Sequence, residues 1–564
     1  MITRQPNPVQ HTPRRASTVL CLGVLIAIIL CLATKGMLNE NNISMNGDMP
    51  RHLMNGALIL DFFRELPIAD PLRFAYNYYA TYPALSLGFH PPLLPLVEAP
   101  VFAILGVSVF SGRVVMVAFL LLGVIAWFKL IQLVYDQKMA LLSSLLLATN
   151  PYLIAQTRIV MTDIPALAMI ILSAYLLILY CTTERRLHGF FFLLAFVLTV
   201  LARPQALFML LVFLAYLALN DRRKPFLSAV TSPLVLLTGM VIVVSIALFI
   251  GFGTHNVGWL TKGGILKHLS MKNLTYPLKC LGSFHIAVSA LVMALVSLLF
   301  ALKRKDRRIL LFLLWIMGCY IQAVYIGPSE SRYSLYWIPP FCLLAALITA
   351  TNDIRINIAT ITIILFISGN QFSHAMAMDP QTNVGYYETA RYLIEGVTDK
   401  NVLYSSSSDT GYLWFFTRSL DPDRKTIIFR ADKILATANF NRIVEERITT
   451  KEELYTTLKE LGIEYVVIDG KEFNSRSLNL LRDEMTSDKF RLLKNIKLQG
   501  KRFPIGSVIS IYQFTEHTPP KQGIQLHMAL PIVNHTITVS LDELMANRRS
   551  QKTDRPDNRE KPLY

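Results

Sequence analysis

Long apolar runs constrain the fold of this chain more than any other feature. A helix that crosses a bilayer needs roughly 20 mostly apolar residues, and runs of that kind recur through the first 373 residues. The 564 residues are 53% hydrophobic and 16% charged, which is too little charge for a soluble protein of this length. We therefore expect a polytopic α-helical membrane protein with about eleven spanning helices. The candidate spans begin near residues 17, 113, 139, 163, 189, 204, 226, 283, 309, 335 and 356.

Two of these runs need interpretation. The first, residues 17–34, follows Arg14 and Arg15 and has no small-residue cleavage site before Lys35, so we expect an uncleaved span after a short N-terminal tail, 1–16. The run 189–220 is too long for one span and is interrupted by Arg203-Pro204. An Arg-Pro pair would be costly in mid-bilayer, which favours two helices that meet at a sharp outer turn. The transmembrane domain is then 17–373.

The net charge of +17 follows the membrane topology. Cytoplasmic loops carry an excess of Lys and Arg, and placing the N-terminus in the cytoplasm puts the basic loops on that side. A basic face for nucleic acid is therefore not indicated. The outer side then receives the loop 35–112 and everything after about residue 374. The inner basic residues are Lys138, Arg185, Arg186, Arg222, Arg223, Lys224, Lys303, Arg304, Lys305, Arg307, Arg308 and Arg355.

The two large outer segments have different patterns. In the loop 35–112, Leu53, Ala57, Leu60 and Phe63 recur at helical spacing, which predicts an amphipathic helix on the membrane surface. Asp61, Arg64 and Glu65 would form its solvated face. Residues 374–520 alternate strand and helix signals and predict a small soluble α/β domain. Its expected strands are 401–405, 425–429, 465–468 and 507–514, its expected helix is 450–461 with a capping box, and 521–564 is expected to be a polar tail.

Charged residues at the outer ends of the apolar runs are costly there and often functional. They come from separate loops but share one membrane face, so they could line a single cavity. This outer set is Asp48, Arg51, His52, His90, Arg113, Arg158, Asp163, Arg203, Glu330 and Arg332.

Carboxylates and guanidinium groups together suit sugar transfer from a polyprenyl phosphate. A carboxylate takes the proton of an acceptor hydroxyl, and Arg holds the departing phosphate with paired donors. Such a reaction needs no nucleotide site, and the chain has no GxxxxGK[ST] motif.

Four motifs in order resemble those of the GT-C glycosyltransferases. The similarity is to the branch with dolichyl-phosphate-mannose protein mannosyltransferases and lipid A aminoarabinose transferases, over about residues 17–345. The motifs are Gly47-Asp48-Met49-Pro50-Arg51-His52, Phe89-His90-Pro91-Pro92-Leu93, Arg158-Ile159-Val160-Met161-Thr162-Asp163-Ile164-Pro165, and Glu330-Ser331-Arg332-Tyr333 followed by Pro339-Pro340.

This resemblance implies a GT-C-like fold and roles for individual residues. Asp48 would be the catalytic base or an essential carboxylate, Asp163 would support the site, and Arg332 with Arg203 would meet the lipid phosphate. Met49 stands where the family commonly has Glu, and His90 where one branch has Lys. The remaining substrate-binding candidates are Arg51, His52, His90, Arg158, Glu330 and Tyr333.

Structural interpretations compete with each of these roles. Asp48 and Asp163 could cap the helices that begin beside them, because Pro follows closely in both cases. Arg332 could anchor to lipid headgroups, and Arg203 could be structural. His52 and His90 are expected at the interface more than as metal ligands. The sequence leaves a divalent metal ion open, because sparse loop carboxylates can converge in space.

The leading functional hypothesis is an integral membrane glycosyltransferase for a hexosyl, mannosyl or aminoarabinose-type sugar. Its partners would be membrane lipids, a polyprenyl-phosphate-linked donor, and a lipid, glycan or protein acceptor, as in lipopolysaccharide modification or protein glycosylation. The expected location is a bacterial inner membrane with the C-terminal domain in the periplasm; an ER membrane is the alternative. A lipid or sugar transporter or flippase, and a catalytically dead assembly protein, are the competing classes, although no internal repeat supports a transporter.

Overall fold

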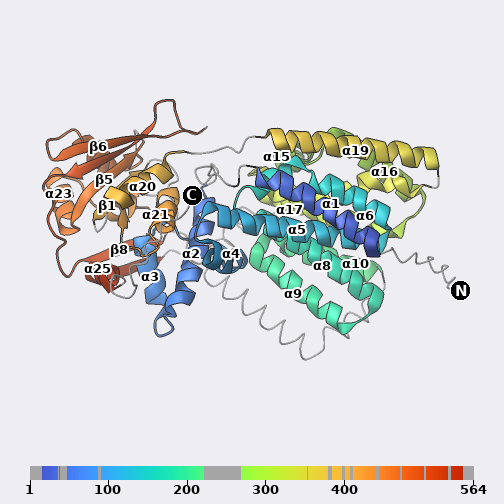
Figure 1. Ribbon diagram of the computed structural model, residues 1–564, viewed down its shortest axis with the longest axis horizontal. Helices are drawn as coiled ribbons and strands as arrows, with labels where there is room; N and C mark the ends of the chain where they lie inside the picture. Colours follow the sequence, from blue (N-terminus) through green and yellow to red (C-terminus); the bar gives the residue numbers. More distant parts are fainter. Residues whose placement is uncertain are drawn as a thin grey trace.

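The structure has a helical bundle at one end and a smaller α/β domain at the other (Figure 1). Three helices of the outer loop lie where the two parts meet. The computed structural model describes residues 15–35, 37, 47–86, 90–220, 269–351, 353–378, 384–396, 400–406, 411–438, 444–470, 473–500, 503–530 and 535–550.

The first half of the bundle follows the apolar runs of the sequence. Its helices end where Pro, Asn or charged residues interrupt those runs, as at Asn150-Pro151 and Arg203-Pro204. The elements are α1 (Arg15–Thr34), α5 (Val109–Val134), α6 (Gln137–Ala148), α7 (Pro151–Thr157), α8 (Asp163–Thr183), α9 (Arg186–Ala202), η1 (Pro204–Leu207) and α10 (Phe208–Leu219).

The second half of the bundle begins after residues 221–268, which lie outside the described part. Its elements are α15 (Met271–Cys280), η2 (Leu281–His285), α16 (Val288–Lys303), η3 (Arg307–Ile309), α17 (Leu310–Ile326), η4 (Ser331–Trp337), α18 (Ile338–Leu347), η5 (Ile348–Ala350) and α19 (Ile354–Ala377).

Six helices among the described residues are long and apolar enough to cross a membrane, or up to eight if each of two bent pairs is one span. The bends are 59° between α6 and α7 and 118° between α15–η2 and α16. The polytopic helical fold is thus confirmed. The expected count of eleven also includes the shorter helices on either side of Arg203, whose break is as expected, and a span near 226 that lies outside the described residues.

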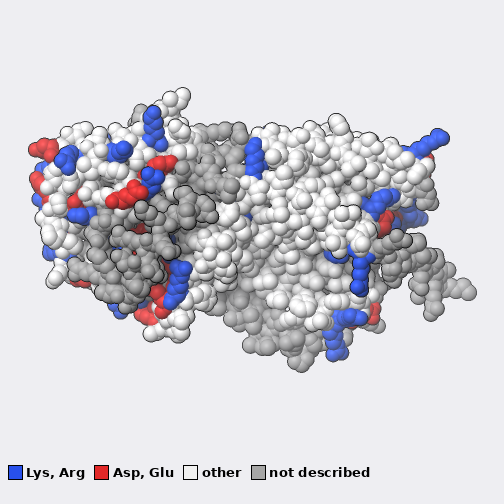
Figure 2. Space-filling view, viewed as in Figure 1, with Lys and Arg blue, Asp and Glu red and all other residues white. Residues whose placement is uncertain are grey.

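The end of the bundle where α1 begins is fixed by contacts between loops far apart in sequence. At the end where α1 begins, Lys138 Nζ donates to Thr349 O at 2.9 Å, Arg304 Nη1 donates to Ala350 O at 3.3 Å, and the Arg308 guanidinium lies over Tyr135. The basic loops therefore gather at this end. Figure 2 shows Lys and Arg near it, a largely uncharged bundle surface, and mixed charges on the α/β domain.

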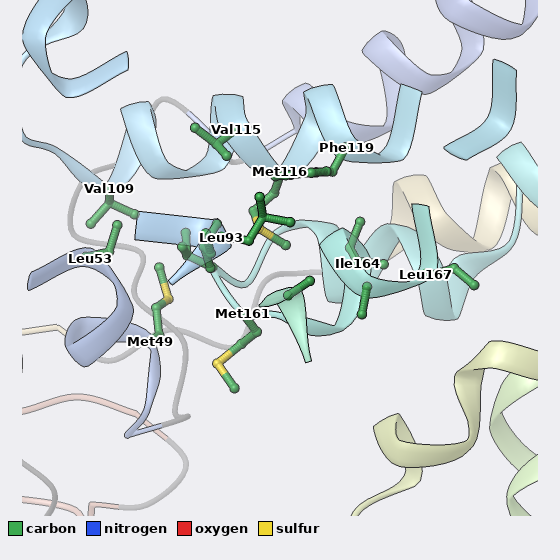
Figure 3. Close-up of a cluster of buried hydrophobic side chains, with 14 of the residues drawn as sticks. Met49, Leu53, Leu93, Val109, Val115, Met116, Phe119, Met161, Ile164 and Leu167 are labelled. Carbon is green, nitrogen blue, oxygen red and sulfur yellow. The ribbon is translucent and has the colours of Figure 1, made fainter. Parts of the chain in front are cut away.

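The outer loop forms three helices between the bundle and the α/β domain: α2 (Met49–Glu65), α3 (Pro71–Thr81) and α4 (Leu93–Leu105). The amphipathic helix expected around Leu53–Phe63 is α2. Apolar side chains from α2, α4, α5 and α8 form one buried cluster, as Figure 3 shows for Met49, Leu53, Leu93, Val109 and Ile164. This packing fixes the start of α2 against the start of α8.

The α/β domain is built on a five-stranded sheet of order β2-β1-β5-β7-β6. Strands β2, β1 and β5 are parallel, whereas β7 and β6 are antiparallel to their neighbours. The expected capping box of Thr450 and Glu453 is present at α23. The elements are α20 (Tyr386–Gly396), β1 (Asn401–Ser406), α21 (Gly411–Leu420), β2 (Ile427–Arg430), α22 (Ala431–Ile434), α23 (Lys451–Glu460), β5 (Ile463–Asp469), α24 (Arg476–Glu484), β6 (Phe490–Lys497) and β7 (Val508–Phe514).

Two small antiparallel sheets complete this part. One pairs β3 (Ala436–Ala438) with β4 (Val444–Glu446), and the other pairs β8 (Gln525–Leu530) with β9 (His535–Ser540), followed by α25 (Leu541–Ser550). The sequence predicted a polar tail from residue 521, but residues 521–550 are folded. Their apolar residues alternate along both strands and are buried, and Glu543 pairs with Arg73 of α3 at 2.7 Å.

A buried ion pair joins the outer loop to the α/β domain. Arg418 of α21 donates from Nε and Nη2 to the two carboxylate oxygens of Asp61 at 2.9 and 2.6 Å, and the Tyr78 hydroxyl donates to the same carboxylate at 2.8 Å. Asp61 was expected on a solvated face and is instead buried. The helix that begins beside Asp48 is thereby attached directly to the α/β domain.

Candidate active site

Asp163 lies at the first position of α8, where its carboxylate is almost fully buried. The chain leaves α7 at Thr157, turns through residues 158–162, and starts α8 at Asp163, with Pro165 in the first turn, where the missing N–H costs no helix hydrogen bond. Thr162 is the N-cap and makes no side-chain cap bond. The Asp163 carboxylate does not cap the helix by a bond of its own; it accepts from Arg203 and Arg332.

Arg203 reaches Asp163 because of the proline that follows it. A residue before Pro is disfavoured in helical conformation, and Arg203 is extended, with φ −159° and ψ 114°, between α9 and η1. Its side chain is buried, Nη1 donates to Asp163 Oδ1, and its guanidinium lies 4.7 Å from the centre of the Tyr333 ring. The expected outer turn therefore delivers a cation into the protein rather than into the headgroup region.

Arg332 contacts three carboxylates from three separate segments. It lies in η4, and its Nη1 is 3.3 Å from Asp163 Oδ2, its Nη2 is 3.6 Å from Asp48 Oδ2, and its Nε is 2.6 Å from Glu330 Oε2. Tyr333 places its ring under both Arg332 and Arg203. Arg332 is thus the residue that connects the first, third and fourth sequence motifs.

Asp48 is the N-cap residue of α2 by position, but its carboxylate makes no cap hydrogen bond. It lies 3.6 Å from Arg332 and 3.6 Å from Arg51, one turn along α2. Its side chain is 32% exposed, compared with 1% for Asp163. The two carboxylates therefore share one guanidinium but differ in exposure, and Asp48 is the more accessible of the two.

Three carboxylates, Asp48, Asp163 and Glu330, face three guanidinium groups, Arg51, Arg203 and Arg332. Glu330 is the most exposed member of this charged cluster, with 51% of its side chain accessible. Buried ion pairs are costly to desolvate and need several partners in good geometry, which the bridging position of Arg332 provides. Arg carries its N–H groups on three nitrogens of a planar fork, so it can span oxygens that lie farther apart than a compact Lys ammonium reaches.

His52 and His90 form a pair beside this cluster. Their ring centroids are 4.1 Å apart, with the planes tilted by 44°. Burial and the neighbouring His90 lower the pKa of His52 well below its usual range. Burial, with Arg51, Arg203 and Arg332, lowers the pKa of His90 to about 3. Both imidazoles are therefore neutral at physiological pH, and neither adds positive charge to the site.

Arg158 is not brought into the charged cluster, although the sequence placed it among the substrate-binding candidates. Its guanidinium donates to three backbone carbonyls: Leu32 O at 3.0 Å, Ala375 O at 3.2 Å and Met378 O at 3.0 Å. These carbonyls end α1 and α19, whose last four C=O groups lack intrahelical partners. Arg158 therefore fastens two helix ends together.

His285 supports η4, and the sequence analysis did not single it out. Trp337 Nε1 donates to His285 Nδ1 at 2.9 Å, so Nε2 carries the hydrogen and donates to Ser331 O at 3.0 Å. Asn150 Nδ2 holds the His285 backbone carbonyl at 2.7 Å, and the Tyr152 and Ser331 hydroxyls are 2.8 Å apart. The only sequence signal was a lone polar residue at the end of an apolar run.

Within the described ranges, no group of three His, Cys, Asp or Glu side chains lies close enough to hold a metal ion. The charged cluster combines each carboxylate with a guanidinium group instead. The expectation of a divalent metal stays a prediction.

The chain resembles known membrane glycosyltransferases in sequence and in structure. Residues 89–249 match the family model "dolichyl-phosphate-mannose-protein mannosyltransferase", which includes the motifs at His90 and at Arg158–Pro165. No curated protein matches the chain. The structure of ArnT from Cupriavidus metallidurans bound to undecaprenyl phosphate matches with a TM-score of 0.56 at 13% identity, over 88% of this chain and 98% of ArnT.

The chain has the GT-C fold. A second solved structure with this GT-C fold, the Archaeoglobus fulgidus oligosaccharyltransferase in complex with Zn and sulfate, matches with a TM-score of 0.51 at 12% identity, over 87% of this chain and 74% of that one. The expected GT-C-like fold is thus confirmed, and the sequence resemblance holds over residues 89–249. The motifs at Asp48 and Arg332 lie outside the matched residues 89–249, so their assignment rests on the geometry described above.

Proposed function

We propose that this protein is an integral membrane glycosyltransferase that moves a sugar from a polyprenyl-phosphate-linked donor to an acceptor hydroxyl. The observation that carries the proposal is the position of Arg332 between Asp48 and Asp163. One guanidinium there touches an accessible carboxylate and a buried one, beside a second buried guanidinium. A base and a phosphate-binding cation are the two groups that this transfer requires.

In the proposed reaction, Asp48 acts as the general base. The acceptor oxygen attacks the anomeric carbon of the donor sugar, and the bond between that carbon and the phosphate oxygen breaks. The polyprenyl phosphate leaves with the electron pair, and the acceptor proton passes to the Asp48 carboxylate. Asp48 suits this role because it is partly exposed and its oxygens are not used to cap α2.

Arg332 and Arg203 would hold the departing lipid phosphate. Asp163 keeps both guanidinium groups in place and neutralises part of their charge before the donor arrives. Glu330 is half exposed on the open side of Arg332, so an incoming phosphate could replace it as the partner of Nε. Tyr333 supports both cations from below through its ring face.

The site lies at the end of the bundle that carries the α/β domain, opposite the basic loops (Figure 1). We assign the basic end to the cytoplasm by the excess of Lys and Arg in its loops. The acceptor would then be glycosylated on the outer face, which for a bacterial inner membrane is the periplasm. The acceptor classes that fit this location are a lipid, a surface glycan and an exported protein.

A transporter or flippase fits this geometry less well. Transporters place substrate sites near the bilayer midplane between repeats, whereas Asp48, Arg203 and Arg332 lie where helices end and the outer loop begins. The position of the charged cluster therefore favours transfer at the membrane surface over passage through the bundle.

The experiment that tests this function follows the labelled sugar. Membranes containing the protein are incubated with radiolabelled polyprenyl-phosphate sugars of the mannosyl and aminoarabinose types, and the label is traced into lipid, glycan and protein fractions. We expect label in one acceptor fraction, and none in membranes that lack the protein. Movement of intact donor across the bilayer without any transfer would instead favour a flippase.

A further inference from the structure

Lys433 is a buried lysine in the α/β domain and lies in the short helix α22, directly after strand β2. Its exposure is 5%, and lysine is rarely buried without a partner. In the part of the chain that the structure describes, its ammonium group has neither a hydrogen bond nor a carboxylate within ion-pair distance. The adjacent Asp432 carboxylate is held by Arg430 instead, at 2.5 and 2.9 Å.

The charges around Lys433 are mostly positive. Arg430 donates from Nη1 to Pro83 O at 3.1 Å, and Arg447 donates to the backbone carbonyl of Lys433 at 3.3 Å. Burial, followed by the repulsion of Arg430, lowers the pKa of Lys433 to about 8, and Arg51 and Arg447 act in the same direction. Asp432 only partly offsets this effect. The fold thus keeps a cation where its surroundings disfavour one.

This cationic group lies on the side of the α/β domain that meets the outer loop, the segment in which α2 begins beside Asp48. Arg51, whose charge reaches Lys433, also pairs with Asp48 at 3.6 Å. The start of α21 packs directly on Pro50, which lies between Asp48 and Arg51 in the sequence: a Cβ added at Gly411 would lie 2.8 Å from Pro50 Cγ. Arg430 and Gly411 therefore contact the outer loop directly, at Pro83 and Pro50, and Lys433 follows Arg430 by three residues.

We infer that Lys433, together with Arg430 and Arg51, binds an anionic group of the acceptor, a phosphate or a carboxylate, while the acceptor hydroxyl lies at Asp48. The inference rests on the proposed function, and it assigns an acceptor that carries a negative charge to the same site. A buried cation without a partner destabilises the fold, and an anion that arrives with the acceptor would compensate it through charge-assisted hydrogen bonds. Lys433 then lowers the stability of the folded protein when no acceptor is bound, and it contributes to binding when one is.

A stability measurement tests the binding group without any knowledge of the acceptor. Lys433→Met in the full-length protein keeps an unbranched apolar side chain and removes the charge. We expect the Tm without ligand to rise by about 1–2 °C, and the increase in Tm that inorganic phosphate or acetate gives the parent protein to be reduced. The control is Lys451→Met, because Lys451 is exposed and paired with Glu484 at 2.5 Å; its Tm should not rise, and its anion response should be unchanged.

The two anions distinguish the source of the negative charge. A response to phosphate at constant ionic strength indicates a phosphorylated acceptor, and a response to acetate indicates a carboxylated one. A lower Tm for Lys433→Met, with an anion response like that of the parent protein, would overturn the inference. In that case Lys433 would be a structural residue.

Transfer kinetics separate this inference from the proposed function. With labelled donor and the acceptor fraction found above, Lys433→Gln should raise the KM for acceptor by about tenfold or more, the loss expected for one charge-assisted contact. The KM for donor should stay the same, and Lys433→Arg should recover part of the loss. An unchanged KM for acceptor contradicts the inference while leaving the transferase intact. Absence of transfer by the parent protein contradicts the proposed function, and the anion response then still tests the binding group.

Discussion

Asp61 and Arg418 form a two-pronged ion pair that is buried between α2 and α21, with donor–acceptor distances of 2.9 and 2.6 Å. Because α2 begins beside Asp48, this pair fixes the helix of the proposed base to the α/β domain. Arg418→Met leaves the buried Asp61 carboxylate with the Tyr78 hydroxyl and one distant cation, Arg64 at 3.9 Å, and we expect it to cost about 3–5 kcal/mol of stability. Thermal unfolding of the purified protein measures this.

The matched control for that variant is Arg73→Met. Arg73 pairs with Glu543 at 2.7 Å but is largely exposed, so its loss should cost little stability. A similar loss of stability for Arg73→Met and Arg418→Met would show that the buried pair has no special role.

Arg332 makes contacts that lysine cannot reproduce. Its three guanidinium nitrogens lie close to Asp48, Asp163 and Glu330, whereas the charge of a lysine ammonium is centred on one nitrogen. Arg332→Lys should keep the protein folded, because the positive charge beside Asp163 is retained, and should lower the transfer rate by about 10²-fold or more. Lys138→Arg, at the opposite end of the bundle, is the control. Full activity in Arg332→Lys would argue against a phosphate-binding role.

Close packing of α2 on α4 depends on Gly56. A Cβ at this position would lie 2.6 Å from Glu98 Oε2 and 2.8 Å from Phe102 Cε2, too close for real atoms. We expect Gly56→Ala to destabilise the protein by about 1–3 kcal/mol through overpacking, as measured by thermal unfolding. Gly23→Ala in α1 meets nothing within 4 Å and should not destabilise. An unchanged Tm for Gly56→Ala would contradict this packing, because Glu98 Cβ, 2.8 Å from the added Cβ, is fixed to the backbone of α4 and cannot swing away.

The neutral His52–His90 pair predicts a specific pH dependence. In the unfolded chain a histidine titrates near pH 6.5, whereas the folded pKa of His90 is about 3. Between these values the unfolded state binds more protons, so stability rises with pH and is lost as pH falls from about 6.5 towards 3. His90→Gln should flatten the dependence of Tm on pH in this window. An equally steep loss in the variant would assign the acid sensitivity to other groups.

Most of the helical fold was accessible from the sequence because its signal is local. Apolar runs mark the spans, and Arg203-Pro204 breaks a run because a residue before proline is disfavoured in a helix. Asp48, Asp163, Arg203 and Arg332 could be proposed as neighbours because charges at the outer ends of spans have one face on which to gather. The family resemblance added the order of the motifs.

What the sequence could not show depends on partners far along the chain. Arg158 looks like a site residue until its three carbonyl partners are seen, and backbone carbonyls leave no trace in a sequence. Asp61 looks solvated because its helix is amphipathic, but Arg418 covers it from another domain. Residues 521–550 contain no long apolar run. Their apolar residues alternate with polar ones, and they become a buried face only when β8 pairs with β9.

In the proposed reaction Asp48 removes the proton from the acceptor hydroxyl. The transfer rate of Asp48→Asn in reconstituted vesicles measures how much the reaction depends on this step. The amide keeps the shape of the side chain and cannot act as a base. The control is Asp483→Asn, an exposed carboxylate of the α/β domain. We predict a rate about 10²–10⁴-fold below that of the parent protein, with abundance and Tm preserved. Transfer by Asp48→Asn at the rate of the parent protein would show that Asp48 is not the general base.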